Sequence, residues 1–172
     1  MLSEDHLIAL SYCSRASFPA AHQGYGVDPE VSRILVCSRR NNQAVDVGGV
    51  LHFGNGMFFQ YLEGPADRVD ALYARICRDP RHHDVQRLTR RTIRNRRFTD
   101  WSMKFVAIER LVSQVLRRHD LEAFDPYRFT PALIDDLVIS CIAGPDSVPD
   151  AEQQIAEPAR RPPLWRRLLG WY

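Results

Sequence analysis

The chain has 172 residues, 45% of them hydrophobic, and a formal net charge of +2 at pH 7. This length predicts one domain with appendages, and the hydrophobic fraction is sufficient for a buried core. The small net charge gives no argument for nucleic-acid binding, and no apolar run approaches the ~20 residues of a membrane span. No signal peptide is visible, so we expect a cytoplasmic protein.

The first half of the chain alternates between strand and helix patterns. Residues 7–14 predict a first strand. Residues 28–30 (Asp-Pro-Glu) predict a helix start, because Asp caps, Pro suits the first helical position and Glu favours the positive end of the helix dipole. Residues 47–53 predict a second strand, and Gly-Asn-Gly at 54–56 predicts a hairpin into a third strand over 57–64.

The second half continues this alternation. Apolar residues from Val69 to Cys77 recur at helical spacing and predict a second helix, which Asp79-Pro80 ends. Residues 85–93 predict a fourth strand and residues 101–108 a fifth. The order predicts an α+β fold, ferredoxin-like β-α-β-β-α-β-β, with a five-stranded mixed sheet and two helices on one face.

The chain changes character after Arg110. Residues 111–118 and 131–142 predict two C-terminal helices, and residues 144–172 predict a Pro-rich linker with a basic amphipathic tail. The expected organisation is therefore a domain over 1–110, a helical extension over 111–143 and the tail. The tail could dock on a partner or on its own domain, and membrane binding is a weaker alternative for so short a segment.

The cysteines give neither a zinc signature nor a disulfide framework, because they lie far apart without a CxxC pair. Cys37 and Cys77 fall in predicted helix interiors, so we expect buried free thiols. The histidines have no metal-ligand spacing either. No metal is therefore expected.

Gln60 is a polar side chain in an otherwise apolar strand. Side chains alternate along a strand, so Phe58, Gln60 and Leu62 share one face, and Met57, Phe59 and Tyr61 share the other. An unpaired buried amide costs roughly 1–3 kcal/mol. The sequence therefore predicts a hydrogen-bonding partner for Gln60.

Other polar side chains also lie on surfaces that should be apolar. Tyr12 shares a strand face with Ile8 and Leu10, Asn42 lies on the stripe of the first helix, and Arg75 lies beside the stripe of the second. Each could be satisfied separately by backbone groups. Together they indicate a pocket between the sheet and the helices.

Several motifs, in this order, resemble those of the BLUF family of blue-light sensors that use flavin. The motifs are YCSRA with Tyr12, SRRNN with Asn42, FFQYLEG with Gln60, LYARI with Arg75, DPRH from Asp79 to His82, and WSM with Trp101 and Met103. The resemblance covers about residues 5–108. Gly48 departs from it, because the family often has a threonine there, and the loop 17–26 is longer than usual.

The resemblance implies a role for each matching residue. A flavin, FAD or FMN, would lie over the sheet between the helices, and Tyr12 would give it an electron and a proton after excitation. Gln60 would bridge Tyr12 and the flavin and would rearrange or tautomerise. The remaining flavin contacts would be Asn41, Asn42, Arg75, Asp79 and His82, and the relay residues would be Trp101 or Met103 in the fifth strand.

The implied protein is a photoreceptor without enzymatic activity of its own. It would signal through the last strand and the C-terminal helices to a separate protein, or by a change of homo-oligomer. An alternative is a non-photoactive interaction module on the same fold that binds nucleic acid through the arginines of Arg87 to Arg97. The simpler explanation of those arginines is an edge strand whose charges protect it against aggregation. A flavin-dependent redox enzyme is a third alternative, for which we find no motif.

Overall fold

The computed structural model describes residues 6–19, 28–99, 104–105 and 109–143. Its elements, in chain order, are β1 (Leu7–Ala16), α1 (Pro29–Gln43), β2 (Gly48–Gly54), β3 (Met57–Pro65), α2 (Ala66–Ile76), β4 (His82–Ile93), β5 (Lys104–Phe105), α3 (Glu109–Arg118), the 3-10 turn η1 (Pro126–Arg128) and α4 (Pro131–Ala143). Within these ranges, no helix combines the length and the apolar character needed to cross a membrane.

The sheet has the strand order β4-β1-β3-β2-β5. The neighbours β4, β1, β3 and β2 pair antiparallel, and this confirms the predicted α+β class. The short β5 pairs parallel with β2 through Lys104 and Phe105. The rest of the predicted fifth strand, including Trp101 and Met103, lies outside the described residues.

β4 begins at His82, three residues before the predicted start. Its first residues still pair with β1, Ala16 opposite His82 and Arg15 opposite His83. The sequence signal failed because His82, His83 and Asp84 are all polar, so they show no alternation. Pairing with a longer β1 determines the strand here, and not its own side-chain pattern.

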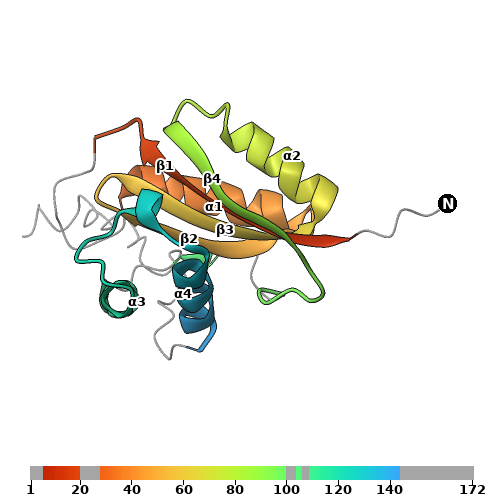
Figure 1. Ribbon diagram of the computed structural model, residues 1–172. Helices are drawn as coiled ribbons and strands as arrows, with labels where there is room; N and C mark the ends of the chain where they lie inside the picture. The colour runs from red at the N-terminus through yellow and green to blue at the C-terminus, as the bar shows by residue number, and fades with distance from the viewer. Residues whose placement is uncertain (1–5, 20–27, 100–103, 106–108, 144–172) are drawn as a thin grey trace, which may run out of the picture.

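The two faces of the sheet carry different helices (Figure 1). On one face, β1 and β3 contribute Ile8, Leu10, Phe58 and Leu62 to an apolar cluster with residues of α1 and α2. On the other face, β2 and β3 pack against α3, η1 and α4. The sheet is therefore a buried middle layer, and β3 contributes side chains to both cores.

The local predictions at α1 and at the hairpin are confirmed. The Asp28 carboxylate accepts a hydrogen bond from the Glu30 backbone N–H at 2.8 Å, and Pro29 opens the helix. Between β2 and β3, Asn55 and Gly56 have φ values of 52° and 70°. Both residues are left-handed, as a two-residue hairpin turn with Asn-Gly requires.

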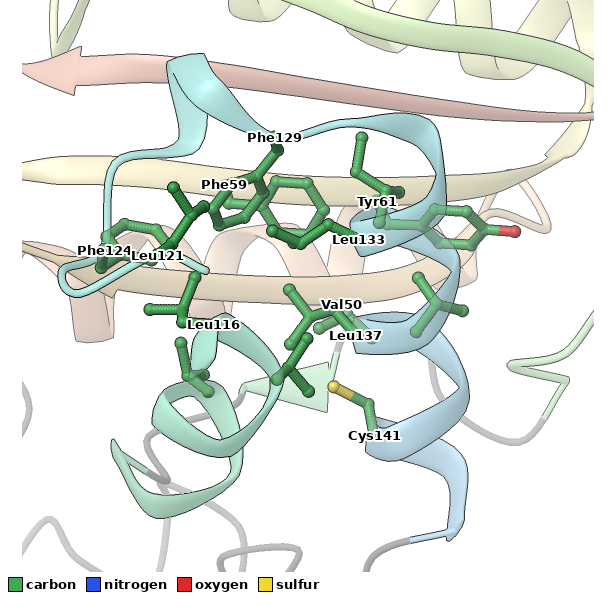
Figure 2. Close-up of a cluster of buried hydrophobic side chains, with 14 of the residues drawn as sticks. Val50, Phe59, Tyr61, Leu116, Leu121, Phe124, Phe129, Leu133, Leu137 and Cys141 are labelled. Carbon is green, nitrogen blue, oxygen red and sulfur yellow. The ribbon is translucent and has the colours of Figure 1, made fainter. Parts of the chain in front are cut away.

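Figure 2 shows the core between the sheet and the C-terminal helices. The Phe59 ring of β3 lies 5.3 Å from the Phe129 ring, centroid to centroid, and Leu133 and Leu137 of α4 are almost completely buried. The predicted alternation of β3 is therefore confirmed, because Phe59 and Tyr61 belong to this cluster while Phe58 and Leu62 belong to the other.

Glu63 is a buried carboxylate on β3 for which the sequence indicated no role. Its Oε1 accepts hydrogen bonds from the backbone N–H groups of Arg97 and Phe98, and its Oε2 accepts one from Tyr61 Oη at 3.3 Å. A buried charge is tolerated when donors surround it in this way. Glu63 therefore holds the segment after β4 against β3.

The expectation of buried thiols is wrong for both helical cysteines. Cys37 and Cys77 are exposed, whereas Cys13 and Cys141 are buried. Cys77 is the C-cap residue of α2, past its last turn, so the apolar stripe of the helix does not include it. Cys37 lies on α1 two residues after the buried Leu35, which turns it away from the stripe.

β4 is an edge strand of the sheet, as predicted from its many arginines. Arg90 pairs with Asp70 of α2, and Arg91 pairs with Asp135 of α4. Arg96, just beyond the strand, pairs with Asp46. These arginines are thus directed to the chain's own carboxylates.

We expect Leu133→Ala to lower the free energy of unfolding by about 2–5 kcal/mol, because it opens a cavity in the core of Figure 2. The matched control on the same helix is Ile139→Ala, whose side chain is 52% exposed and whose loss should cost about 0.5 kcal/mol or less. Urea unfolding measures both. Equal losses would show that α4 is not packed on the sheet as described.

Candidate functional site

A pocket of about 590 Å³ lies between the sheet and the two helices α1 and α2. This volume is in the range of small-molecule sites. Among the residues that line it are these predicted site residues: Tyr12, Asn41, Asn42, Gln60, Arg75, Asp79 and His82. The structure therefore brings together residues that lie up to seventy positions apart in the sequence.

Tyr12 and Gln60 form the floor of the pocket. They are directly opposite each other in the antiparallel pair of β1 and β3, so their side chains leave the same face of the sheet. Tyr12 Oη donates a hydrogen bond to Gln60 Oε1 at 2.5 Å. Tyr12 is thus a hydrogen-bonding partner of Gln60, as the sequence predicted.

Tyr12 is held as a neutral phenol. Its side chain is 1% exposed, and burial, followed by the nearby Cys77 and Tyr73, raises the pKa of its hydroxyl far above the usual range. A phenol in this state remains a hydrogen-bond donor to Gln60 at any physiological pH. The proton can leave Tyr12 only if the ring first becomes a much stronger acid.

The α1 wall of the pocket combines amides with apolar surface. Asn42 is 1% exposed at the end of α1, and Asn41 is half-buried beside it. The backbone carbonyl of Asn42 accepts hydrogen bonds from Val45 N and Val47 N, which fixes the end of the helix over β2. Ile34 completes this wall.

The loop after α2 supplies an ion pair at the mouth of the pocket. Arg81 donates to the Asp79 carboxylate from Nε at 2.9 Å and from Nη2 at 2.5 Å, and the Arg81 backbone N–H donates at 3.0 Å. These bonds hold the pKa of Asp79 at about 2, well below its usual range. Asp79 thus has its partner in Arg81, and Arg75 lies exposed at the rim.

Sequence reasoning missed Arg81 although it lies inside the DPRH motif. The spacing of an aspartate and an arginine two residues apart after a helix was the available signal. Arg78 and Ser38 also line the pocket and were not predicted. Ser38 is a half-buried residue of α1, and Arg78 is an exposed residue just after the C-cap of α2, so neither carried a sequence signal for a site.

His82 anchors the start of β4 beside the pocket. Its Nδ1 shares a 2.9 Å hydrogen bond with Ser14 Oγ, and its ring lies 4.7 Å from the Phe58 ring. Burial lowers the pKa of His82, so the imidazole is neutral at pH 7. Its contribution is therefore shape and hydrogen bonding, and not charge.

The pocket has three chemical zones. Amides and a phenol lie at its inner end, the apolar side chains of Ile34, Leu72 and Ile76 lie along its walls, and arginines lie at its mouth. This arrangement suits a planar heterocycle with hydrogen-bonding groups on one edge and an anionic substituent that reaches the mouth.

Comparison with curated proteins finds light-regulated relatives. A photoactivated adenylate cyclase subunit beta-like protein of Euglena gracilis is 38% identical over 109 residues, which are 62% of this chain and 12% of that protein. The blue light- and temperature-regulated antirepressor BluF of Escherichia coli is 46% identical over 55 residues, which are 32% of this chain and 13% of that protein. The chain thus spans about one eighth of the length of these relatives.

Comparison with solved structures finds the same fold. The dark-state structure of BlrB, a BLUF protein, is 30% identical, with a TM-score of 0.64 over 81% of this chain and 97% of that one. The photo-activated state of BlsA has a TM-score of 0.72 over 83% of this chain and 99% of that one, at 22% identity, which shows the fold alone.

The family model described as BLUF, sensors of blue-light using FAD, matches residues 7–104. This range contains β1 to β4 and every described residue of the pocket. The chain therefore belongs to the BLUF family.

Proposed function

We propose that this chain is a blue-light photoreceptor that binds a flavin non-covalently in the pocket between the sheet, α1 and α2. The observation that carries the proposal is the buried hydrogen bond from Tyr12 to Gln60 at the floor of that pocket. The names of the relatives support it, because they describe proteins regulated by light.

The residues of the pocket fit a flavin. The isoalloxazine ring is planar and carries carbonyl and ring-nitrogen groups on one edge, for which Asn41, Asn42 and Gln60 offer both donors and acceptors. The apolar walls suit its faces. Arg75 and Arg78 at the mouth suit the phosphate of the ribityl chain. The family description names FAD, and FMN carries the same ring and a phosphate.

When bound and excited by blue light, the flavin supplies a one-electron oxidant beside Tyr12. Oxidation turns the phenol into a strong acid, so the Tyr12 Oη proton moves along the short hydrogen bond to Gln60 Oε1. A primary amide can then exchange its donor and acceptor ends by rotation or tautomerisation. Gln60 is proposed as the group that retains the changed hydrogen-bond pattern.

The proposed signal leaves the pocket through the strand that carries Gln60. Phe59 and Tyr61 flank Gln60 on β3 and point to the opposite face, where Phe59 contacts Phe129. A shift at Gln60 thus reaches the core beneath the C-terminal helices within one residue. Trp101 or Met103 is proposed as a second relay. On the described side of that segment, Glu63 holds the backbone of residues 97–98 against β3.

The proposed output is an effect on a separate cytoplasmic protein or on a homo-oligomer, without enzymatic activity in this chain. The alternative of nucleic-acid binding through β4 is not favoured, because Arg90, Arg91 and Arg96 pair with carboxylates of the chain. A phosphate backbone would have to displace these partners.

The visible absorption spectrum of the purified, flavin-loaded chain tests the proposal. We expect a flavin spectrum that shifts slightly to the red after blue light and returns in darkness. A chain that takes up neither FAD nor FMN, or that takes one up without a reversible shift, would overturn it.

Gln60→Leu should retain the flavin and lose the red shift, because leucine fills the space but has no donor or acceptor to exchange. We expect the affinity for flavin to fall about tenfold or less, as for the loss of one hydrogen bond. The control is Tyr61→Phe on the same strand, which points away from the pocket and should keep the shift. A normal shift in Gln60→Leu would remove Gln60 from the switch.

Tyr12→Phe should bind flavin and lack the photocycle, because phenylalanine has neither the proton nor the accessible oxidation of a phenol. The buried ring is retained but the hydrogen bond to Gln60 is lost, so we expect the free energy of unfolding to fall by about 0.5–1.5 kcal/mol. Transient absorption after a blue pulse is the measurement. An intact photocycle in this variant would show that Tyr12 is not the donor.

A further inference from the structure

Two oxidisable side chains that the proposed function does not use lie next to Tyr12. The Tyr73 ring of α2 is 5.6 Å from the Tyr12 ring, centroid to centroid, with the planes tilted by 53°. This separation is direct aromatic contact. Tyr12 is among the residues that line the pocket, and Tyr73 is not among them. Tyr73 therefore contacts Tyr12 from outside the pocket lining.

Cys77 extends this contact to the surface. It follows Tyr73 by one helical turn, and its backbone N–H donates to the Tyr73 carbonyl at 3.0 Å. The two side chains are neighbours on one face of the helix end, because they lie four residues apart. Cys77 is exposed, whereas Tyr12 is fully buried. Tyr12, Tyr73 and Cys77 thus form an unbroken series from the pocket floor to solvent.

Tyr73 has the protonation state that such a series needs. Burial, followed by the neighbouring Cys77 thiol, raises the pKa of Tyr73 to about 12. The phenol is therefore neutral at pH 7 and has a proton to release on oxidation. Its side chain is only partly buried, so water can accept that proton.

We propose that Tyr73 and Cys77 form a radical-transfer route, which moves the radical from oxidised Tyr12 to the surface and makes Cys77 a light-dependent oxidation site. The route rests on the proposed function, because Tyr12 must first lose an electron to the photoexcited flavin. It competes with the return of that electron to Tyr12.

The route has two steps. In the first, oxidised Tyr12 takes one electron from Tyr73 and recovers its proton from Gln60, while Tyr73 releases its phenolic proton to water. In the second, a hydrogen atom moves from Cys77 Sγ to Tyr73 Oη, so an S–H bond breaks and an O–H bond forms. Both tyrosines are restored. Cys77 has lost one electron, taken by the photoexcited flavin, and one proton, taken by water.

Cys37 provides an internal control within the same molecule. It is also an exposed thiol, and it lines the pocket from α1, so diffusing oxidants formed at the flavin would reach it at least as easily. The route through Tyr73 ends at Cys77 and does not include Cys37. Selective oxidation of Cys77 therefore separates the route from general photo-oxidation.

The experiment uses the full chain loaded with FAD, under continuous blue light without oxygen and with a nitrone spin trap that captures thiyl radicals. Peptide mass spectrometry then quantifies trap adducts at Cys77 and at Cys37. We expect a Cys77 adduct in the light and none in darkness. We expect Tyr73→Phe, which keeps the ring and removes the hydroxyl, to reduce it at least tenfold and to leave the low Cys37 background unchanged.

The red shift is recorded on the same samples, so that the photoreceptor function and the Tyr73–Cys77 route are tested separately. A normal red shift with no Cys77 adduct, with an adduct that persists in Tyr73→Phe, or with equal adducts at Cys37 and Cys77 would overturn the route and leave the photoreceptor. An absent red shift in the wild-type chain would overturn the proposed function. Because the route rests on that function, the same result would overturn the route as well.

Discussion

The site depends on one cross-strand pair. Tyr12 and Gln60 face each other across β1 and β3, and their hydrogen bond lies at the floor of the pocket. In water such a bond contributes little, because solvent competes for both groups. Here both side chains are buried, so the bond has a fixed geometry. Any change in it must therefore shift the side chains packed around it. The helices α1 and α2 serve this pair by excluding water.

β3 connects the two halves of the molecule. Its alternating side chains enter the pocket face and the face covered by α3 and α4, so no intermediate layer separates a change at Gln60 from the C-terminal helices. Glu63 adds a second connection from the same strand to the backbone of residues 97–98. Packed cores respond to small shifts by changing between discrete arrangements, and this suits a sensor.

Local chemistry predicted much of this structure from the sequence. The cap at Asp28, the Asn55-Gly56 turn and the alternation of β3 each follow from short-range rules, and the polar residues on apolar surfaces led to the pocket. Long-range pairing was the part that the sequence did not show. The start of β4 depends on the length of β1, the partner of Asp79 on how the loop closes, and the surroundings of Glu63 on a segment more than thirty residues away.

The burial of both faces of β1 and β3 has a consequence for how faithfully the site is assembled. A slip of the two strands by one residue would turn one member of the tyrosine–glutamine pair to the wrong side, and it would also transfer apolar side chains between the two cores. Both cores therefore penalise the same error. The alignment of Tyr12 with Gln60 is thus enforced by hydrophobic packing on two sides of the sheet, and its accuracy does not depend on the strength of the hydrogen bond itself.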